Sequence, residues 1–205
     1  MMRLAWLAAA LLALAACAAR GVREEPPGAT DALAAERLLS ARESQLFERA
    51  RFELEGRIAV SDGKDGGSGR FEWQQRGAAT SLRFYGPASA RNWRLEVQPG
   101  QALLIESNGA VRTADSAQAL LARELRWQFP ADALRYWVLG MRAPGGDSEA
   151  GLGADGQLAW LHQSGWEIRY LAFDFLHDPP LPRKLYARRG EHQLRISVRR
   201  WDFQE

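Results

Sequence analysis

The stretch from Phe52 to Val97 constrains the fold more than any other part of this chain, because apolar and polar residues alternate along it. Alternation with a period of two is typical of β-strands that keep one face dry and one face in water. Four segments carry the pattern: FELEGRIAV, GRFEWQQ, TSLRFYG and NWRLEVQ. The sequence therefore predicts four strands, each with an apolar face rich in aromatic side chains.

Turn-forming residues separate these segments at Asp62 to Gly67, at Arg76-Gly77 and at Gly86-Pro87. Such turns bring each strand back beside the previous one, which predicts an antiparallel meander. The glycines of the first turn do not match a phosphate-binding loop, and a strand follows them, so we interpret this segment as a hairpin loop. The aromatic face must be covered by helices of the same chain or by a bound ligand.

A further strand is expected at Gln101 to Ser107, between Pro99-Gly100 and Asn108-Gly109, and the meander should end at about Thr113. The consecutive apolar residues in this strand predict burial on both of its faces: Leu103, Leu104 and Ile105.

Composition limits the class of protein. The chain has 205 residues, of which 46% are hydrophobic and 25% charged, enough for one domain with a sizeable core. Its formal net charge is only +2, so nothing argues for a nucleic-acid partner.

The first residues predict export and lipid attachment. An apolar run from Leu4 to Ala16 would span roughly 20 Å as a helix, too short for the hydrocarbon core of a bilayer, and indicates a signal peptide over 1–16. It ends in Leu-Ala-Ala-Cys, which resembles the lipobox of bacterial lipoproteins, with Cys17 as the acylated residue. Cys17 is the only cysteine. The lipoprotein pattern implies the outer membrane, facing the periplasm, because Ala18 stands where an aspartate would retain the protein in the inner membrane.

Residues 17–30 then form a lipidated N-terminus and tether, and 31–205 form the domain. The domain should open with a helix from Asp31 to about Arg51, which Asp31 caps. Five apolar residues define a broad stripe that we expect to pack against the sheet: Leu33, Leu38, Leu39, Leu46 and Phe47.

Two more helices are expected after the meander. Asp115 should cap the first, which carries Ala119, Leu120, Leu121 and Leu125. The second, ADALRYWVLG, should stop at Gly140 and present Leu134, Trp137 and Val138 on one face.

The segment 142–155 is rich in glycine and charge and is interpreted as a loop, after which alternation returns. Inward positions are expected at Trp160, Trp166, Ile168, Tyr170, Leu185, Leu194, Ile196 and Val198. The opposite face of the last strands is basic, through Arg183, Lys184, Arg188, Arg189, Arg195, Arg199 and Arg200. These cations either guard a solvated sheet edge or form a docking face for an acidic partner or anionic headgroups.

No catalytic pattern stands out. The three histidines have no metal-ligand spacing, no serine lies in a nucleophile elbow, and the carboxylates are dispersed. We therefore expect neither an enzyme nor a metal or cofactor site.

Taken in order, FELEGRIAV, GRFEWQQ, the GP pair, DSAQALL, ALRYWVLGM, QSGWEIRY and LPRKL resemble the LolB family of outer-membrane lipoproteins, over about Glu43 to Trp201. The resemblance implies an α+β fold: an antiparallel sheet curled into an incomplete barrel, with helices covering an apolar cavity. It also implies a monomer that accepts lipoproteins from the periplasmic carrier LolA and inserts them into the outer membrane.

On this resemblance, candidate acyl-chain contacts are Phe71, Trp73, Phe84, Trp93, Leu95, Leu134, Trp137, Val138, Trp166 and Ile168. A loop after the GP pair, Gly86, Pro87 and Ala88, would meet the membrane, although the family commonly places a leucine where this chain has Ala88. Two other classes stay open: an envelope-assembly or scaffold lipoprotein with a filled core, and a periplasmic lipid hydrolase.

Overall fold

A computed structural model describes residues 29–49, 51–87 and 92–203 of the protein. The expected signal peptide, Cys17, most of the tether and Ala88 lie outside the described residues. The chain divides into two units, Met1–Ala34 and Ala35–Glu205, and the fold described below belongs to the second. None of the described helices combines the length and apolarity that crossing a membrane requires.

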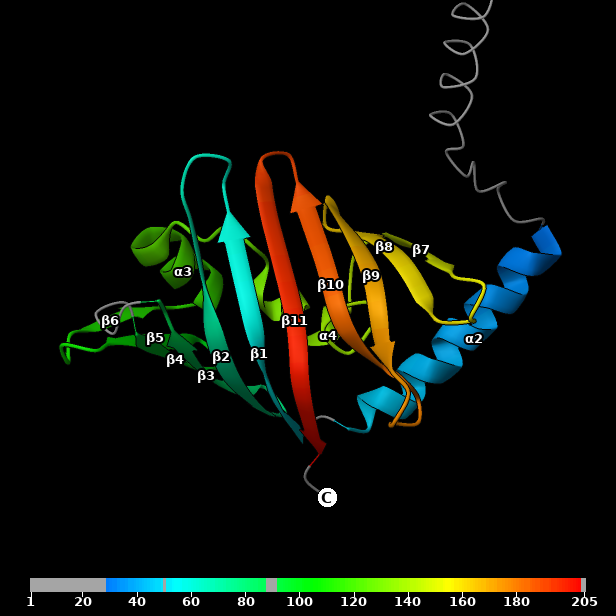
Figure 1. The fold of residues 1–205 in the computed structure, drawn as a ribbon, viewed down its shortest axis with the longest axis horizontal. Helices are drawn as coiled ribbons and strands as arrows, with labels where there is room; N and C mark the ends of the chain where they lie inside the picture. The colour runs from blue at the N-terminus through cyan, green and yellow to red at the C-terminus, as the bar shows by residue number, and fades with distance from the viewer. Residues whose placement is uncertain (1–28, 50, 88–91, 204–205) are drawn as a thin grey trace, which may run out of the picture. The chain divides into compact units, whose positions relative to one another are not determined.

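The described part of the second unit is built on one antiparallel sheet of eleven strands in the order β6-β5-β4-β3-β2-β1-β11-β10-β9-β8-β7 (Figure 1). The strands are β1 (Arg51–Ser61), β2 (Gly66–Arg76), β3 (Ala79–Tyr85), β4 (Trp93–Gln98), β5 (Gln101–Glu106), β6 (Val111–Ala114), β7 (Ser148–Leu152), β8 (Leu158–Gln163), β9 (Trp166–Asp174), β10 (Leu181–Arg189) and β11 (His192–Phe203).

The sheet curls without closing, because its edge strands β6 and β7 do not pair. Helices α3 (Ala117–Leu125) and α4 (Ala131–Trp137) lie behind the curved sheet in Figure 1. The expected incomplete barrel with helices is therefore confirmed. The predicted meander is the half of the sheet from β1 to β6, and alternate residues of β1 and β2 are buried, as the sequence pattern requires.

The predicted hairpin loop at Asp62 to Gly67 is shorter than expected, because β2 already begins at Gly66. The next two glycines of the cluster leave room for aromatic rings. A Cβ on Gly69 would lie 2.7 Å from the ring of Phe84, and a Cβ on Gly67 would lie 3.1 Å from Trp127. These glycines therefore serve close packing within a strand.

The segment 142–155 is not the continuous loop that its composition predicts, since it contains edge strand β7, paired with β8. Trp160 does not point inward, because Leu161 and Gln163 occupy the buried positions of β8. The other predicted inward positions are buried. Of the three consecutive apolar residues in β5, only Leu104 is fully buried, while Leu103 and Ile105 are partly exposed, so burial on both faces is incomplete.

Two predicted helices follow the meander, with one change of cap. Ser116, not Asp115, caps α3, and its hydroxyl accepts from the backbone N–H of Ala119 at 3.2 Å. Helix α4 starts after Pro130 and ends at Trp137, before the predicted stop at Gly140, where the backbone has a positive φ.

Helix α2 (Ala29–Phe47) begins before Asp31, the residue at which the sequence predicts its start. Its predicted apolar stripe is wrong in part: Leu39 and Leu46 are buried, whereas Leu33, Leu38 and Phe47 are exposed. Ion pairs hold this helix as well as apolar contacts. Arg142 contacts Glu43 at 2.7 Å and Glu36 at 2.9 Å.

The basic residues of the last strands do not guard an edge. Strands β10 and β11 lie inside the sheet, three and four places from the edge strand β7 and further still from the other edge strand, β6. The interpretation as edge protection is therefore wrong, and the cations need another explanation.

Candidate functional site

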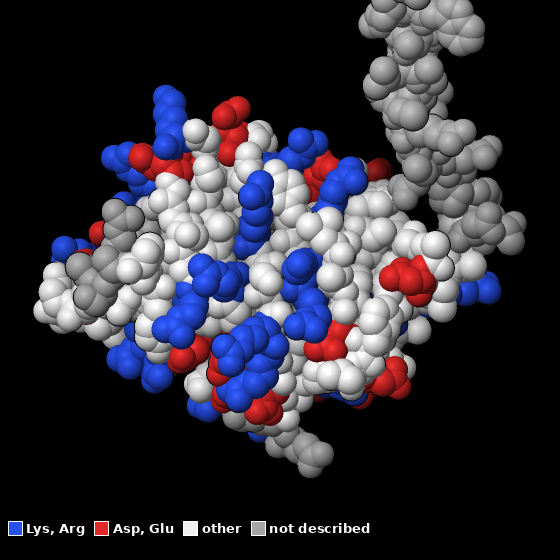
Figure 2. Space-filling view, in the orientation of Figure 1, with Lys and Arg blue, Asp and Glu red and all other residues white. Residues whose placement is uncertain are grey.

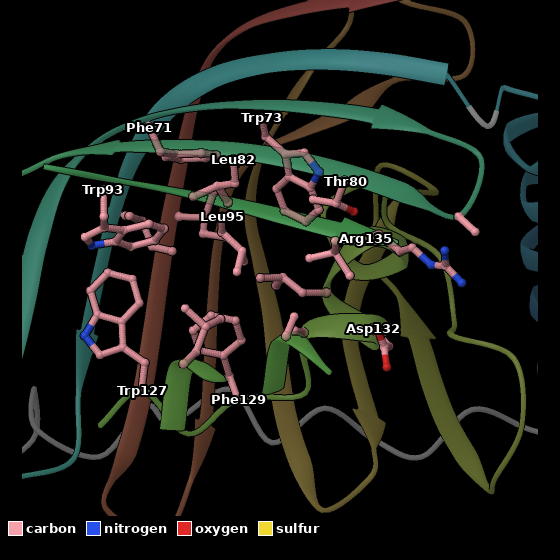
Figure 3. A pocket seen from close by; sticks show the side chains of 18 residues that line it. Phe71, Trp73, Thr80, Leu82, Trp93, Leu95, Trp127, Phe129, Asp132 and Arg135 are labelled. Atoms are coloured by element: carbon pink, nitrogen blue, oxygen red, sulfur yellow. The ribbon is translucent and has the colours of Figure 1, made fainter. Parts of the chain in front are cut away.

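An apolar cavity of about 50 Å³ lies between the inner face of the β1–β4 region and the α3–α4 segment (Figure 3). Sheet side chains such as Phe71, Trp73 and Leu82 approach it from one side, and Phe129 from the other. The full lining is Ile58, Phe71, Trp73, Ala78, Thr80, Leu82, Trp93, Leu95, Val97, Ala117, Leu121, Trp127, Phe129, Ala131, Asp132, Leu134, Arg135 and Ile196.

Three aromatic rings close one end of the cavity. Phe84 and Trp93 are stacked, with ring centroids 4.9 Å apart. Trp127 stands edge-on to both, at 5.3 Å from Phe84 and 5.5 Å from Trp93. Edge-to-face and offset-stacked contacts are the arrangements that aromatic pairs prefer, so this end is firmly packed.

Local backbone geometry places Trp127 there. Arg126, which follows α3, adopts a left-handed conformation with φ 57°, and the backbone N–H of Trp127 donates to the carbonyl of Leu121 at 3.1 Å. This C-cap turns the chain back toward the sheet. Gly67 on β2 leaves the space that the indole needs.

At the other end, a buried glutamine satisfies the polar atoms of the lining. Gln75 is 3% exposed, and its Oε1 accepts from the indole N–H of Trp73 at 3.0 Å and from the hydroxyl of Thr80 at 2.7 Å. Its amide donates to the carbonyl of Gly77 at 2.8 Å. Because these polar groups are paired with one another, the cavity surface itself is apolar.

Arg135 is the polar exception. Its Nε is buried and has no hydrogen-bond partner among the described residues, and its guanidinium lies 4.8 Å from the ring centroid of Tyr136. Figure 3 shows Arg135 and Asp132 together at one side of the cavity. A buried unpaired donor costs free energy, so Arg135 is a weakly held part of the wall.

Two larger hollows adjoin the cavity. One of about 250 Å³ shares Ala78 and Arg135 with it and continues past Phe52 and Met141. The other, of about 720 Å³, shares only Trp93 and Trp127 with the cavity and reaches Pro87. Movement of Arg135 would therefore join the cavity to the 250 Å³ hollow, and movement of Trp127 would join it to the 720 Å³ hollow, whose lining also includes Glu106 and Glu124.

The structure brings together half of the predicted acyl-chain contacts. Five of them line the cavity: Phe71, Trp73, Trp93, Leu95 and Leu134. Phe84 lines the hollow beyond the aromatic rings. Trp127 and Phe129 belong to the cavity although strand and helix periodicity did not select them, because they lie in the connection between α3 and α4.

The remaining four predicted contacts, Trp137, Val138, Trp166 and Ile168, do not line this cavity and are buried elsewhere in the core. The indole N–H of Trp137 donates to Oε1 of Gln163 at 2.9 Å. Tyr170 donates its hydroxyl to the carbonyl of Trp137 at 3.0 Å, and burial raises the pKa of Tyr170.

Of the predicted membrane loop, Gly86 and Pro87 are described. The N–H of Gly86 donates to the side chain of Asn92 at 3.1 Å, which ties the two ends of the loop together. Pro87 is exposed at the mouth of the 720 Å³ hollow. Ala88 lies outside the described residues.

Among solved structures, a LolA superfamily protein from Nitrosomonas europaea resembles this fold with a TM-score of 0.54 at 10% identity, covering 83% of this chain and 94% of that one. A DUF1329 family protein from Desulfovibrio piger gives a TM-score of 0.53 at 9% identity, covering 84% and 93%. At such low identity these likenesses concern the fold alone.

Sequence comparison is more specific. The outer-membrane lipoprotein LolB of Xylella fastidiosa (strain 9a5c) is 35% identical over 185 residues, 89% of this chain and 84% of the relative. That of Alkalilimnicola ehrlichii is 35% identical over 193 residues, 94% and 92% of the two chains. The profile of the family described as "Outer membrane lipoprotein LolB" matches residues 50–201. The chain therefore belongs to the LolB family of outer-membrane lipoproteins.

Proposed function

We propose that this protein accepts acylated lipoproteins from a LolA-type periplasmic carrier and passes their acyl chains to the outer membrane. The observation that carries the proposal is the apolar cavity between the inner face of the sheet and α3–α4, in a chain of the LolB family. Support also comes from the LolA-like fold, since related folds on donor and acceptor suit a transfer of the same cargo.

The energetics explain why such a receptor is useful. Each methylene exposed to water costs about 0.8 kcal/mol, so three chains of about fifteen carbons would cost on the order of 35 kcal/mol if fully exposed. Free diffusion of the cargo is therefore negligible. Transfer needs only that each successive apolar site binds the chains more favourably than the one before, and no nucleotide is required.

The cavity must open to take an acyl chain, because about 50 Å³ holds only one or two water-sized groups. The two hollows beside it supply the additional space. We infer that cargo enters as the side chains of Arg135 and Trp127 move aside and the three spaces join. The hollow that reaches Pro87 then leads the chains toward the proposed membrane loop.

Lipid attachment at Cys17 would hold the receptor at the membrane, with residues 17–30 as its tether and residues 1–16 removed as the signal peptide. In this proposal the anchor contributes location and not cargo binding. A form with Cys17→Ala and a cleavable secretory signal should be soluble and should still accept lipoproteins.

The test is transfer of a labelled lipoprotein from the loaded carrier to this protein, followed by co-purification. Stable transfer in the absence of nucleotide would support the proposal. Failure of a folded protein to take cargo would favour a scaffold lipoprotein with a filled core. Turnover of ester substrates by the same preparation would instead identify a lipid hydrolase.

A further inference from the structure

The outer face of the sheet carries a row of unpaired cations across its central strands. Arg57 on β1 lies directly opposite Arg70 on β2, and on its other side it is opposite Ser197 of β11. Ser197 is in turn opposite Lys184 on β10. With strands about 4.8 Å apart, Arg57 and Lys184 are separated by about 10 Å across the sheet. Figure 2 shows Lys and Arg side chains gathered over these strands.

A fourth cation, Arg195, lies at the next position along the strands on the same face. Arg195 lies opposite both Ala59 and Tyr186, and its guanidinium stacks 5.4 Å from the ring centroid of Tyr186. Arg57, Arg70, Lys184 and Arg195 are all exposed. We call these four residues the basic row.

Several other cations on the sheet are paired with carboxylates, in contrast to the basic row. Arg83 contacts Glu72, Arg188 contacts Glu167 and Arg200 contacts Glu55. No member of the basic row forms an ion pair with a residue in the part of the chain that the structure describes. Like charges directly opposite each other destabilise a sheet, so the row opposes folding in the free protein.

Apolar surface lies among these cations. A shallow groove of about 520 Å³ runs between Arg57, Lys184 and Arg195, and it is also lined by Leu171 and Tyr186. Leu171 is 65% exposed. Cations beside an exposed leucine and a tyrosine match the interfacial region of a bilayer, where phosphate groups border the acyl chains and tyrosine is enriched.

We propose that the basic row is a docking surface for a bilayer that contains anionic phospholipids, with the phosphate-bearing headgroups neutralising its charge. A protein of this family resides at the outer membrane, so such a surface is always within reach. The contact would orient the receptor on the membrane. It does not depend on the cargo handover proposed above, and it can fail or hold independently of it.

The two lysines of the chain provide an internal control, because Lys184 belongs to the basic row and Lys64 lies in the exposed β1–β2 turn. The acylated full-length protein is reconstituted into vesicles of phosphatidylcholine alone or with one third phosphatidylglycerol. An amine-acetylating reagent is added, and modification of each lysine is followed by mass spectrometry. We expect acetylation of Lys184 to slow several-fold in the anionic vesicles, with Lys64 unchanged and the effect lost in 0.5 M salt.

Substitutions in the basic row test which cations cause the protection of Lys184. Arg57→Gln combined with Arg195→Gln should lower the equilibrium constant between the docked and undocked states by about fivefold for each cation removed. The matched control is Arg83→Gln, which removes a paired cation from the same sheet and should leave the protection of Lys184 unchanged. Arg57→Gln alone should also raise the melting temperature, because it relieves the repulsion from Arg70, so the variants are expected to fold.

Equal acetylation of Lys184 in both kinds of vesicle would overturn the proposal. Protection that appears only when a loaded carrier protein is added, and does so equally in neutral vesicles, would also overturn it and would assign the basic row to an acidic protein partner.

Discussion

Trp127, from the connection between α3 and α4, stands edge-on to Trp93 of β4, with their ring centroids 5.5 Å apart. This single contact separates the enclosed cavity from the large hollow that reaches Pro87, because both rings line both spaces. The strength of this contact should therefore set how readily the cavity and the hollow join.

We predict that Trp127→Ala joins the cavity to that hollow. The variant should bind a fluorescent long-chain fatty acid more tightly and lose about 3 to 5 kcal/mol of the free energy of unfolding, as buried tryptophan truncations do. Gly67→Ala should act in the opposite direction, because its methyl group would press against the indole at 3.1 Å. Identical probe affinity in both variants and in the unmodified protein would show that Trp127 does not control access.

Trp73 and Trp137 should behave differently, although the sequence predicts both as acyl-chain contacts. Trp73→Leu changes the wall of the cavity and should alter probe affinity. Trp137→Phe removes the hydrogen bond to Gln163 in a separate part of the core, so it should cost about 1 to 3 kcal/mol of stability and leave probe affinity unchanged. Urea unfolding and probe titration of the same two proteins separate these effects, and weakened binding by a stable Trp137→Phe variant would contradict the assignment.

The position of α2 should depend on Arg142. Arg142→Met leaves Glu43 and Glu36 without their cation and should destabilise the protein by about 2 kcal/mol, less than for a fully buried pair because Arg142 is 21% exposed. Combining it with Glu43→Gln should recover part of the loss. Additive losses in this double-mutant cycle would mean that the pair contributes nothing to stability.

Alkaline stability should depend on Tyr170. Burial raises the pKa of its hydroxyl above the ordinary value of 10.0, so the folded protein holds a proton that the unfolded chain releases. The resulting stabilisation is present in full below pH 10 and is lost as the pH rises further. Tyr170→Phe should be less stable at pH 7 by about 1 kcal/mol and should show a flatter decline above pH 10. Parallel declines in chemical denaturation at several pH values would exclude this role.

For the loop after Gly86-Pro87, Ala88→Leu should leave acceptance of cargo unchanged and speed its incorporation into liposomes, since a larger apolar side chain enters the membrane boundary more favourably. Ala88→Glu should slow incorporation, because a charge opposes entry. Acceptance and incorporation are measured separately. Equal incorporation by all three forms would show that the loop has no insertion role in this protein.

The sequence predicts the β1–β6 half of the fold well, because alternation in β1 to β4 is strong and the turns carry glycine, proline or asparagine. It misses β7, whose five residues, Ser148–Leu152, have almost no apolar alternation and depend on pairing with β8. It also misjudges α2, where apolar residues occur on several sides of the helix. Which leucines are buried there depends on partners distant in sequence, including Arg142.

The candidate site is predictable only where a strand or helix supplies it. Trp73 and Leu95 follow from strand periodicity, whereas Trp127 lies in an irregular connection, and its position results from the left-handed turn at Arg126. The division of the core into a cavity and a filled region, with Trp137 in the latter, depends on side-chain packing that periodicity does not specify.

The pairing of β1 with β11 also bears on how the chain folds. All other neighbouring strands in the sheet follow one another directly in the sequence, so each half of the sheet can assemble from local hairpins. The β1–β11 ladder alone joins the start of the domain to its last strand, with Phe52 opposite Phe203. Closing so long a loop is slow, and it must wait until β11 has been synthesised. We therefore expect the aromatic inner face of β1–β4 to stay exposed until β11 is available, and a chaperone that shields this face would raise the yield of folded protein.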